Sequence, residues 1–120
     1  MTIGEVSEKF DMTTDTLRYY ERIGLIPPVP RKTNGIRDYD ETACKWVSFI
    51  KCMRSAGVQI EALIEYVTLM QANTGLERRK NILIEQRARL IEQVQYLRTT
   101  IERLDYKIDH YEDLILKRGL

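Results

Sequence analysis

Apolar residues in the first part of the chain recur at the spacing of an amphipathic α-helix. Thr2 heads a capping-box pattern, so we expect a helix to begin at Ile3. A second helix is expected after Thr13, a good N-cap, and Gly24 is expected to end it. Two short helices joined by a tight turn, over residues about 3–22, predict a helix-turn-helix.

The next segment has the pattern of a small hairpin. Three prolines between positions 27 and 30 prevent further helix. Asn34-Gly35 is a strong signal for a tight β-turn. The strands on either side can only be short, so residues about 27–40 predict a wing rather than a sheet.

Two more helices are expected before residue 72. Asp40 is placed to cap a helix over about 41–56, and Gly57 is placed to end it. A further helix follows over about 60–71, with apolar residues on one face. Residues 1–72 therefore predict one winged helix-turn-helix domain in a mainly α-helical protein.

Beyond Gly75 the apolar pattern changes to a period of seven, which is typical of a coiled coil. The predicted interface residues of this coiled coil are Leu90, Val94, Leu97, Ile101, Leu104, Ile108 and Tyr111. A helix continuous to about Lys117 would be about 60 Å long. A helix with one apolar seam and no internal partner needs another chain, so residues 76–118 predict a dimerisation helix and a homodimer.

The positive charge of the chain is concentrated in one segment. The net charge is only +1, but five basic residues and one acidic residue, Glu21, lie between Leu17 and Arg37. The basic residues are Arg18, Arg22, Arg31, Lys32 and Arg37. Basic and phenolic groups on a helix and an adjacent hairpin can grip two parts of one DNA duplex.

The hydropathy of the chain indicates a cytoplasmic protein. No apolar run is long enough to span a bilayer, and the N-terminus lacks the pattern of a signal peptide. Cys44 and Cys52 are then expected as thiols. Eight residues apart on one helix, they would be about 12 Å apart along its axis, which is too far for a disulfide.

Two motifs are specific enough to indicate a family. They are T-x-x-x-L-R-Y-Y-E-R-I-G-L at Thr13–Leu25 and N-G-I-R-D-Y at Asn34–Tyr39. With the order of the elements, they resemble the MerR family of bacterial transcription regulators over nearly the whole chain. The resemblance implies a dimer with an antiparallel coiled coil that binds double-stranded promoter DNA at a two-fold symmetric site. It also implies that the dimer distorts an over-long promoter spacer so that RNA polymerase engages both promoter elements.

The resemblance also assigns roles to residues. Arg18 matches the recognition-helix arginine, and Arg37 and Tyr39 match a pair in the wing that grips the DNA backbone. Tyr19 and Tyr20 match a tyrosine pair, although helical periodicity directs Tyr20 to the core. Residues at the start of a recognition helix usually meet base edges. The expected DNA-binding residues are Thr14, Asp15, Arg18, Tyr19, Tyr20, Arg22, Lys32, Arg37 and Tyr39.

The residue that senses the inducing signal is expected to be Cys52. There is no cysteine after it, and His110 is the only histidine, so neither a metal site nor a cofactor is expected. No segment is expected to form a separate ligand domain. The segment Lys45–Tyr66 resembles the branch of the family often called AdhR or NmlR, whose members respond to aldehydes and other thiol-reactive electrophiles. Cys52 occupies the position of their sensing cysteine.

Two interpretations of Cys52 stay open at this point. It is either a reactive sensor thiol or a small buried hydrophobe beside Phe49 and Ala56. Basic neighbours in the sequence favour a thiolate, whereas the end of a helix disfavours an anion. Those basic neighbours are Lys45, Lys51 and Arg54. Cys44 is interpreted as structural or incidental.

The leading hypothesis is therefore a homodimeric transcription regulator that is switched when Cys52 is modified. The alternative is a regulator or repressor of the same fold that has no thiol sensing. An enzyme is not expected, because the sequence has no Cys-x-x-Cys, no cofactor glycine motif and no nucleophile with an obvious histidine base.

Overall fold

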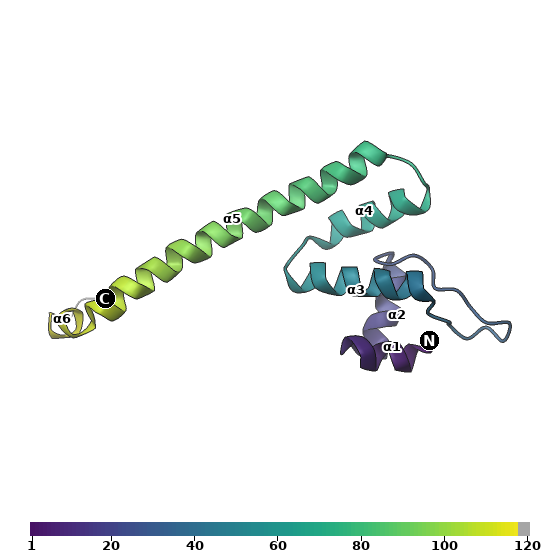
Figure 1. The fold of residues 1–120 in the computed structure, drawn as a ribbon, viewed down its shortest axis with the longest axis horizontal. Helices are drawn as coiled ribbons and strands as arrows, with labels where there is room; N and C mark the ends of the chain where they lie inside the picture. The colour runs from purple at the N-terminus through teal and green to yellow at the C-terminus, as the bar shows by residue number, and fades with distance from the viewer. Residues whose placement is uncertain (118–120) are drawn as a thin grey trace. The chain divides into compact units, whose positions relative to one another are not determined.

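The structure, a computed structural model, describes residues 1–117 of the 120. Its helices are α1 (Ile3–Phe10), α2 (Thr14–Ile23), α3 (Glu41–Ser55), α4 (Ile60–Gln71), α5 (Leu76–Asp109) and α6 (Tyr111–Leu116) (Figure 1). Within this range the only β-structure is an isolated antiparallel bridge between Arg31 and Arg37. The predicted mainly α-helical class is confirmed. Residue 118, the last of the expected coiled-coil segment, lies outside the described residues.

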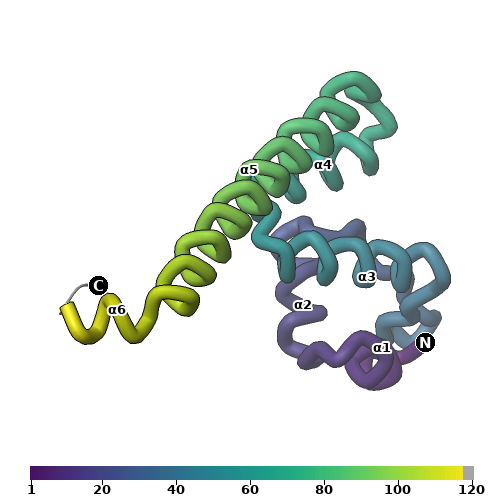
Figure 2. Tube along the Cα trace, turned by 60° about the vertical axis from the view of Figure 1, so that its left-hand side comes forward, coloured from purple at the N-terminus to yellow at the C-terminus, as the bar shows by residue number. Residues whose placement is uncertain are grey.

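The helix-turn-helix forms through the caps that the sequence predicts. Thr2 Oγ1 accepts a hydrogen bond from the Glu5 N–H at 3.1 Å, and the Glu5 carboxylate accepts one from the Thr2 N–H at 2.9 Å. Asp11 adopts a left-handed conformation (φ 52°) and turns the chain. Thr13 Oγ1 then accepts from the Thr16 N–H at 3.1 Å and starts α2. Figure 2 shows α1 and α2 as neighbours, as their backbone contacts require.

The helical hairpin of α3 and α4 also follows the predicted boundaries. Asp40 Oδ1 accepts from the Ala43 N–H at 2.8 Å and caps α3. Gly57 has φ 86°, a left-handed value that favours glycine, and it reverses the chain toward α4. Both helices contribute buried residues to the core, among them Val47, Ile50, Leu63 and Val67.

The N-terminal compact unit is longer than the domain expected from the sequence. It extends from Met1 to Gln86 and so includes the first turns of α5. Ile82 is 1% exposed, and Arg78 donates hydrogen bonds to both carboxylate oxygens of Glu65 at 2.8 and 2.9 Å. Residues 72–75 form a turn within this unit, because α5 returns to pack against α4.

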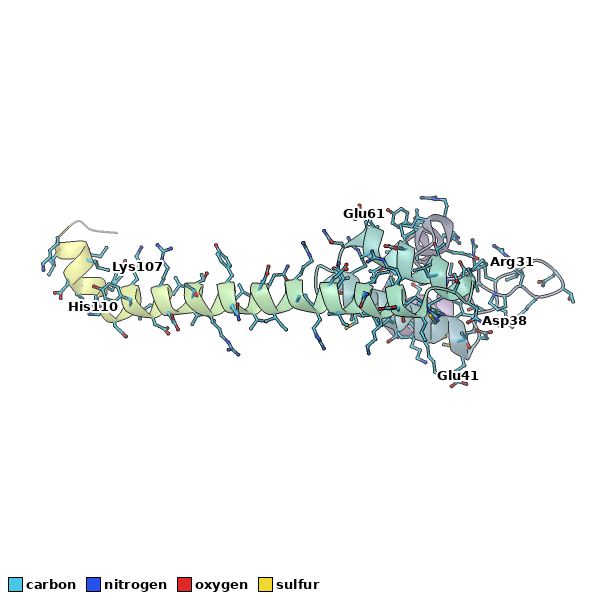
Figure 3. The ribbon with its side chains drawn as sticks, turned by 90° about the horizontal axis from the view of Figure 1, so that it is seen from above. Arg31, Asp38, Glu41, Glu61, Lys107 and His110 are labelled. Carbon is cyan, nitrogen blue, oxygen red and sulfur yellow. The ribbon has the colours of Figure 1, made fainter. Side chains whose placement is uncertain are left out.

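The second unit begins at Arg87 and holds the rest of α5 and all of α6. The predicted continuous helix to Lys117 is wrong, because α5 ends at Asp109 and His110 interrupts the helix with φ −110° and ψ 18°. His110 Nδ1 lies 2.8 Å from the Tyr106 carbonyl oxygen, and the two rings stack at 4.2 Å. At about 1.5 Å per residue, the 34 residues of α5 span about 51 Å rather than 60 Å. Figure 3 labels Lys107 and His110 at this break.

None of the helices within residues 1–117 combines the length with the apolar character that a bilayer crossing requires.

Candidate nucleic-acid interface

The exposed face of α2 carries the basic and aromatic groups expected to contact DNA. Leu17 is fully buried and Tyr20 is 8% exposed, so these two residues anchor the helix to the core. Arg18, Tyr19 and Arg22 are exposed. The helical period separates the two sets, as the sequence predicts. The prediction that Tyr20 lies in the core is confirmed, so its phenol is not part of the exposed face.

The start of α2 forms a small polar network around Arg18. Arg18 Nη1 donates to Asp15 Oδ1 at 3.1 Å and to Thr14 Oγ1 at 3.3 Å. Asp15 is 95% exposed, and an ion pair this open contributes about 0–1 kcal/mol. A phosphate or a base edge can therefore replace these contacts at low cost in free energy.

Tyr19 and Arg22 form a second pair on the same helix. The guanidinium of Arg22 lies 5.4 Å from the centre of the Tyr19 ring, a cation–π distance. Tyr19 is 40% exposed, so its hydroxyl can be reached from solvent. The pair presents one cation and one phenol at the end of α2 where the chain enters the wing.

The wing is a tight turn that is held by backbone hydrogen bonds. The Lys32 N–H donates to the Ile36 carbonyl at 2.8 Å, and the Asp38 N–H donates to the Pro30 carbonyl at 2.7 Å. Gly35 has φ 83°, as the predicted Asn-Gly turn requires. Lys32 is exposed at this turn, and Arg31 and Asp38 are labelled on the same loop in Figure 3.

Glu21 joins the wing to α2, a contact for which the sequence contains no local signal. Its Oε1 accepts from Arg37 Nε at 2.7 Å, and its Oε2 accepts from the Val29 N–H at 2.8 Å. Arg31 Nη2 is 3.9 Å from the same carboxylate. Burial alone would raise the pKa of Glu21, but the hydrogen bonds from Arg37 and Val29 and the nearby arginine charges outweigh it and lower the pKa.

Tyr39 is placed differently from what the family pattern implies. Its side chain is 1% exposed, and its hydroxyl has no hydrogen-bond partner among the described residues. Burial raises the pKa of this phenol. The expectation that the Tyr39 side chain contacts DNA is therefore wrong, because the ring packs into the core at the base of the wing. Arg37, the other member of the expected pair, is 23% exposed.

The structure thus brings most of the expected DNA-binding residues onto two adjacent elements. Seven of the nine have side chains that are exposed or partly exposed on α2 or on the wing: Thr14, Asp15, Arg18, Tyr19, Arg22, Lys32 and Arg37. The other two, Tyr20 and Tyr39, are core residues.

Cys52 is an exposed thiol on α3, whereas Cys44 is only partly exposed. The interpretation of Cys52 as a buried hydrophobe is therefore wrong. Its three basic neighbours in the sequence have other partners: Lys51 Nζ donates to the Phe10 carbonyl, Arg54 to the Val58 carbonyl at 2.7 Å, and Lys45 pairs with Glu41 at 3.5 Å. The Cys44 sulfur lies 3.8 Å from the sulfur of Met1.

The seam expected to form the dimer interface is open to solvent in the single chain. Leu90 is half-buried, and the seam residues Val94, Leu97, Ile101, Leu104, Ile108 and Tyr111 are 47–69% exposed. Tyr111 lies on α6 and does not continue the seam of α5, because the helix breaks at His110. Two further apolar residues flank the seam, Ile84 and Ile91, and their seven-residue spacing could have been found in the sequence.

Residues 1–117 contain no group of three or more histidine, cysteine or acidic side chains arranged to hold a metal ion.

Taken together, the fold and the basic face of α2 and its wing define a winged helix-turn-helix protein. A model of the MerR HTH family of regulatory proteins matches residues 1–69. The HTH-type transcriptional regulator AdhR of Bacillus subtilis (strain 168) is 61% identical over 93 residues, or 77% of this chain and 66% of AdhR. The chain therefore belongs to the MerR family of transcription regulators.

Two solved structures have the same fold. A protein described as a MerR family transcriptional regulator, from Listeria monocytogenes, is similar with a TM-score of 0.88 at 40% identity, over 98% of this chain and 90% of that one. HiNmlR, described as a MerR family regulator lacking the sensor domain and bound to promoter DNA, has a TM-score of 0.83 at 23% identity, over 98% and 94%. The match to AdhR spans slightly less than two thirds of its length. These relatives are regulators rather than enzymes, in agreement with the function class expected from the sequence.

Proposed function

We propose that the chain is a homodimeric regulator that binds promoter DNA through α2 and the wing and is switched by modification of Cys52. The observation that carries the DNA-binding part is the exposed row of Arg18, Tyr19 and Arg22 on α2, beside a wing tied to the same helix. A helix in the major groove and a wing on the adjacent backbone use these groups for base edges and phosphates.

A second copy of the chain is proposed to cover the seam on α5. The seam residues are apolar and about half exposed, and a helix of this kind has no stable partner in water except another apolar surface. Two copies related by a two-fold axis would hold two recognition helices at a fixed separation. A DNA site with matching two-fold symmetry follows from that arrangement.

The dimer is proposed to act on transcription by changing the shape of promoter DNA. A protein that bends or untwists a duplex supplies the deformation energy from its own contacts, so its conformational state sets the shape of the DNA. With an over-long spacer, the distorted duplex would let RNA polymerase engage both promoter elements. The regulator then needs no extensive contact with the polymerase.

The proposed input is the thiol of Cys52. An exposed thiolate can add to the carbonyl carbon of an aldehyde, and the resulting alkoxide takes a proton from water to give a hemithioacetal. Cys52 lies in the last turn of α3, four residues before the C-cap Ala56, whose N–H donates to the Cys52 carbonyl at 3.1 Å. An adduct at this place would disturb the turn that joins α3 to α4. The resemblance of the segment Lys45–Tyr66 to the AdhR and NmlR branch supports the choice of this cysteine.

DNA binding is tested by selecting duplexes from a random-sequence pool with the wild-type protein. Enrichment of a site with two-fold symmetry is the expected result, and a pool that stays random would overturn the proposal. Thiol sensing is tested by exposing the protein to methylglyoxal and locating the adduct by mass spectrometry. Cys44→Ser is the matched control: it should leave the adduct in place, whereas Cys52→Ser should remove it.

A regulator of the same fold without thiol sensing is the second candidate. It is favoured by the contacts of Lys45, Lys51 and Arg54, which bind other groups and not the sulfur of Cys52 among the described residues. Such a protein would occupy its site equally before and after exposure to an aldehyde. Equal transcription from a promoter that contains the selected site, with and without aldehyde, would favour it.

A further inference from the structure

Glu21 is an acidic residue in the middle of a basic surface, and α2 itself does not explain its presence. It lies near the C-terminal end of α2, where the helix dipole disfavours an anion. It is also the one acid between Leu17 and Arg37, so on a surface used for phosphate its charge is unfavourable. Its side chain is only 12% exposed. The presence of an acidic residue at this position must therefore be explained by its contacts.

Both oxygens of the Glu21 carboxylate are used, and both bind the segment that leads into or out of the wing. Oε2 accepts from the Val29 N–H at 2.8 Å, just before the wing turn. Oε1 accepts from Arg37 Nε at 2.7 Å, just after it. One side chain of α2 thus holds both arms of the hairpin at its base. Charge-assisted hydrogen bonds of this kind are short and directional.

The contact also fixes how Arg37 is presented. Glu21 binds Nε, and the two terminal nitrogens of the guanidinium have no hydrogen-bond partner among the described residues. Arg31 shows a related arrangement, since its Nη1 donates to the Gly35 carbonyl at 3.1 Å and its Nη2 lies 3.9 Å from Glu21. A guanidinium anchored at one nitrogen can still offer the others to a phosphate in a defined direction.

We propose that Glu21 is a positioning residue for DNA binding: its carboxylate fixes the wing and the Arg37 guanidinium relative to α2, so that both elements meet one duplex in a single register. The inference rests on the proposed function of α2 and the wing. Without the carboxylate the wing would keep its turn but move independently of the recognition helix, and each contact with phosphate would then have to be ordered at the time of binding.

The test compares the affinities of the wild type and four variants for the tightest-binding duplex selected by the wild type. Glu21→Gln keeps the shape of the side chain and removes its charge, and we expect about a tenfold loss of affinity. Glu21→Asp keeps the charge but shortens the reach, and it should lose a similar amount. When Glu21→Gln is added to Arg37→Ala, the affinity should fall by less than a further factor of about two, because the guanidinium that Glu21 positions is already absent.

A matched control separates this role from a general effect on the fold or the charge. Glu65→Gln removes a carboxylate that binds Arg78 in the same compact unit, and it changes the net charge by the same amount. It should leave the affinity within about twofold of the wild type.

Three results would overturn the inference. They are wild-type or tighter binding by Glu21→Gln, wild-type binding by Glu21→Asp, and losses that multiply when Glu21→Gln and Arg37→Ala are combined. If Glu21→Gln does not fold, the pair Glu21→Asp and Arg37→Ala gives the same comparison. A failure to select any duplex with the wild type would count instead against the proposed function.

Discussion

Gln59 and Gln86 bind each other through their amides, at the place where the α3–α4 turn meets α5. The Gln59 N–H donates to Gln86 Oε1 at 3.3 Å, and Gln86 Nε2 donates to Gln59 Oε1 at 3.2 Å. Gln86 is 8% exposed and is the last residue of the N-terminal compact unit. The pair gives the buried Gln86 side chain its hydrogen-bond partners and ties the start of α4, which lacks a side-chain cap, to the long helix.

Removing this pair should destabilise the N-terminal unit. Gln86→Ala removes the two hydrogen bonds between this buried side chain and Gln59, and we expect the free energy of unfolding to fall by about 1–3 kcal/mol. Chemical denaturation measures the change. Gln93→Ala, at an exposed position on the same helix, is the control and should change the value by less than about 0.5 kcal/mol. Equal effects from the two substitutions would contradict this account of Gln86.

Arg18 is expected to contribute a phosphate or base contact. Arg18→Ala should weaken binding to the selected duplex, and if the contact is to phosphate, the slope of log affinity against log salt concentration should fall by about 1. A titration at several salt concentrations measures both quantities. Arg98→Ala removes an exposed arginine from α5, in the second compact unit, and should change neither. An unchanged affinity in Arg18→Ala would remove this residue from the interface.

The seam of α5 should govern the oligomeric state. Leu97→Asp places a charge in the middle of the proposed dimer interface, where burying it would be costly, so the protein should become monomeric. Light scattering after gel filtration should then give 14.2 kDa instead of twice that mass. Gln95→Asp, an exposed position of the same helix away from the seam, should stay dimeric. A dimer in Leu97→Asp would contradict the assignment of the seam.

The ion pairs of Glu21 predict how stability depends on pH. The pKa of Glu21 in the folded protein is lowered from 4.5, so its contribution to stability is fully present above pH 4.5 and is lost as the pH falls through the lowered pKa. The wild type should therefore melt at a higher temperature than Glu21→Gln at pH 7. The difference should shrink as the pH falls below about 4.5. A difference that stays constant with pH would contradict this assignment.

Much of the fold follows from local signals in the sequence. The cap residues Thr2, Thr13 and Asp40 and the left-handed Gly57 set boundaries that local hydrogen bonding alone decides. The break at His110 was missed because it contains neither proline nor glycine; it depends on a stacked Tyr106 and on a hydrogen bond to a helix carbonyl.

The candidate site was harder to predict where it depends on contacts between distant residues. Glu21 binds Arg37 from 16 positions away, and no periodicity reports such a pair. The position of Tyr39 was also missed, because a hairpin with short arms has too few residues for an alternating pattern to show which side chains point inward. The exposure of Cys52 could not be decided from a helix that has apolar residues on more than one face.

The proposed switch depends on the link between modification of Cys52 and the action of the DNA-binding face on transcription. The most direct measurement is transcription in vitro from a promoter that contains the selected site, with purified polymerase and with or without methylglyoxal. We predict that the aldehyde increases transcription with the wild type and with Cys44→Ser, and that Cys52→Ser binds the promoter as tightly but gives no increase. An equal increase with Cys52→Ser would contradict the account.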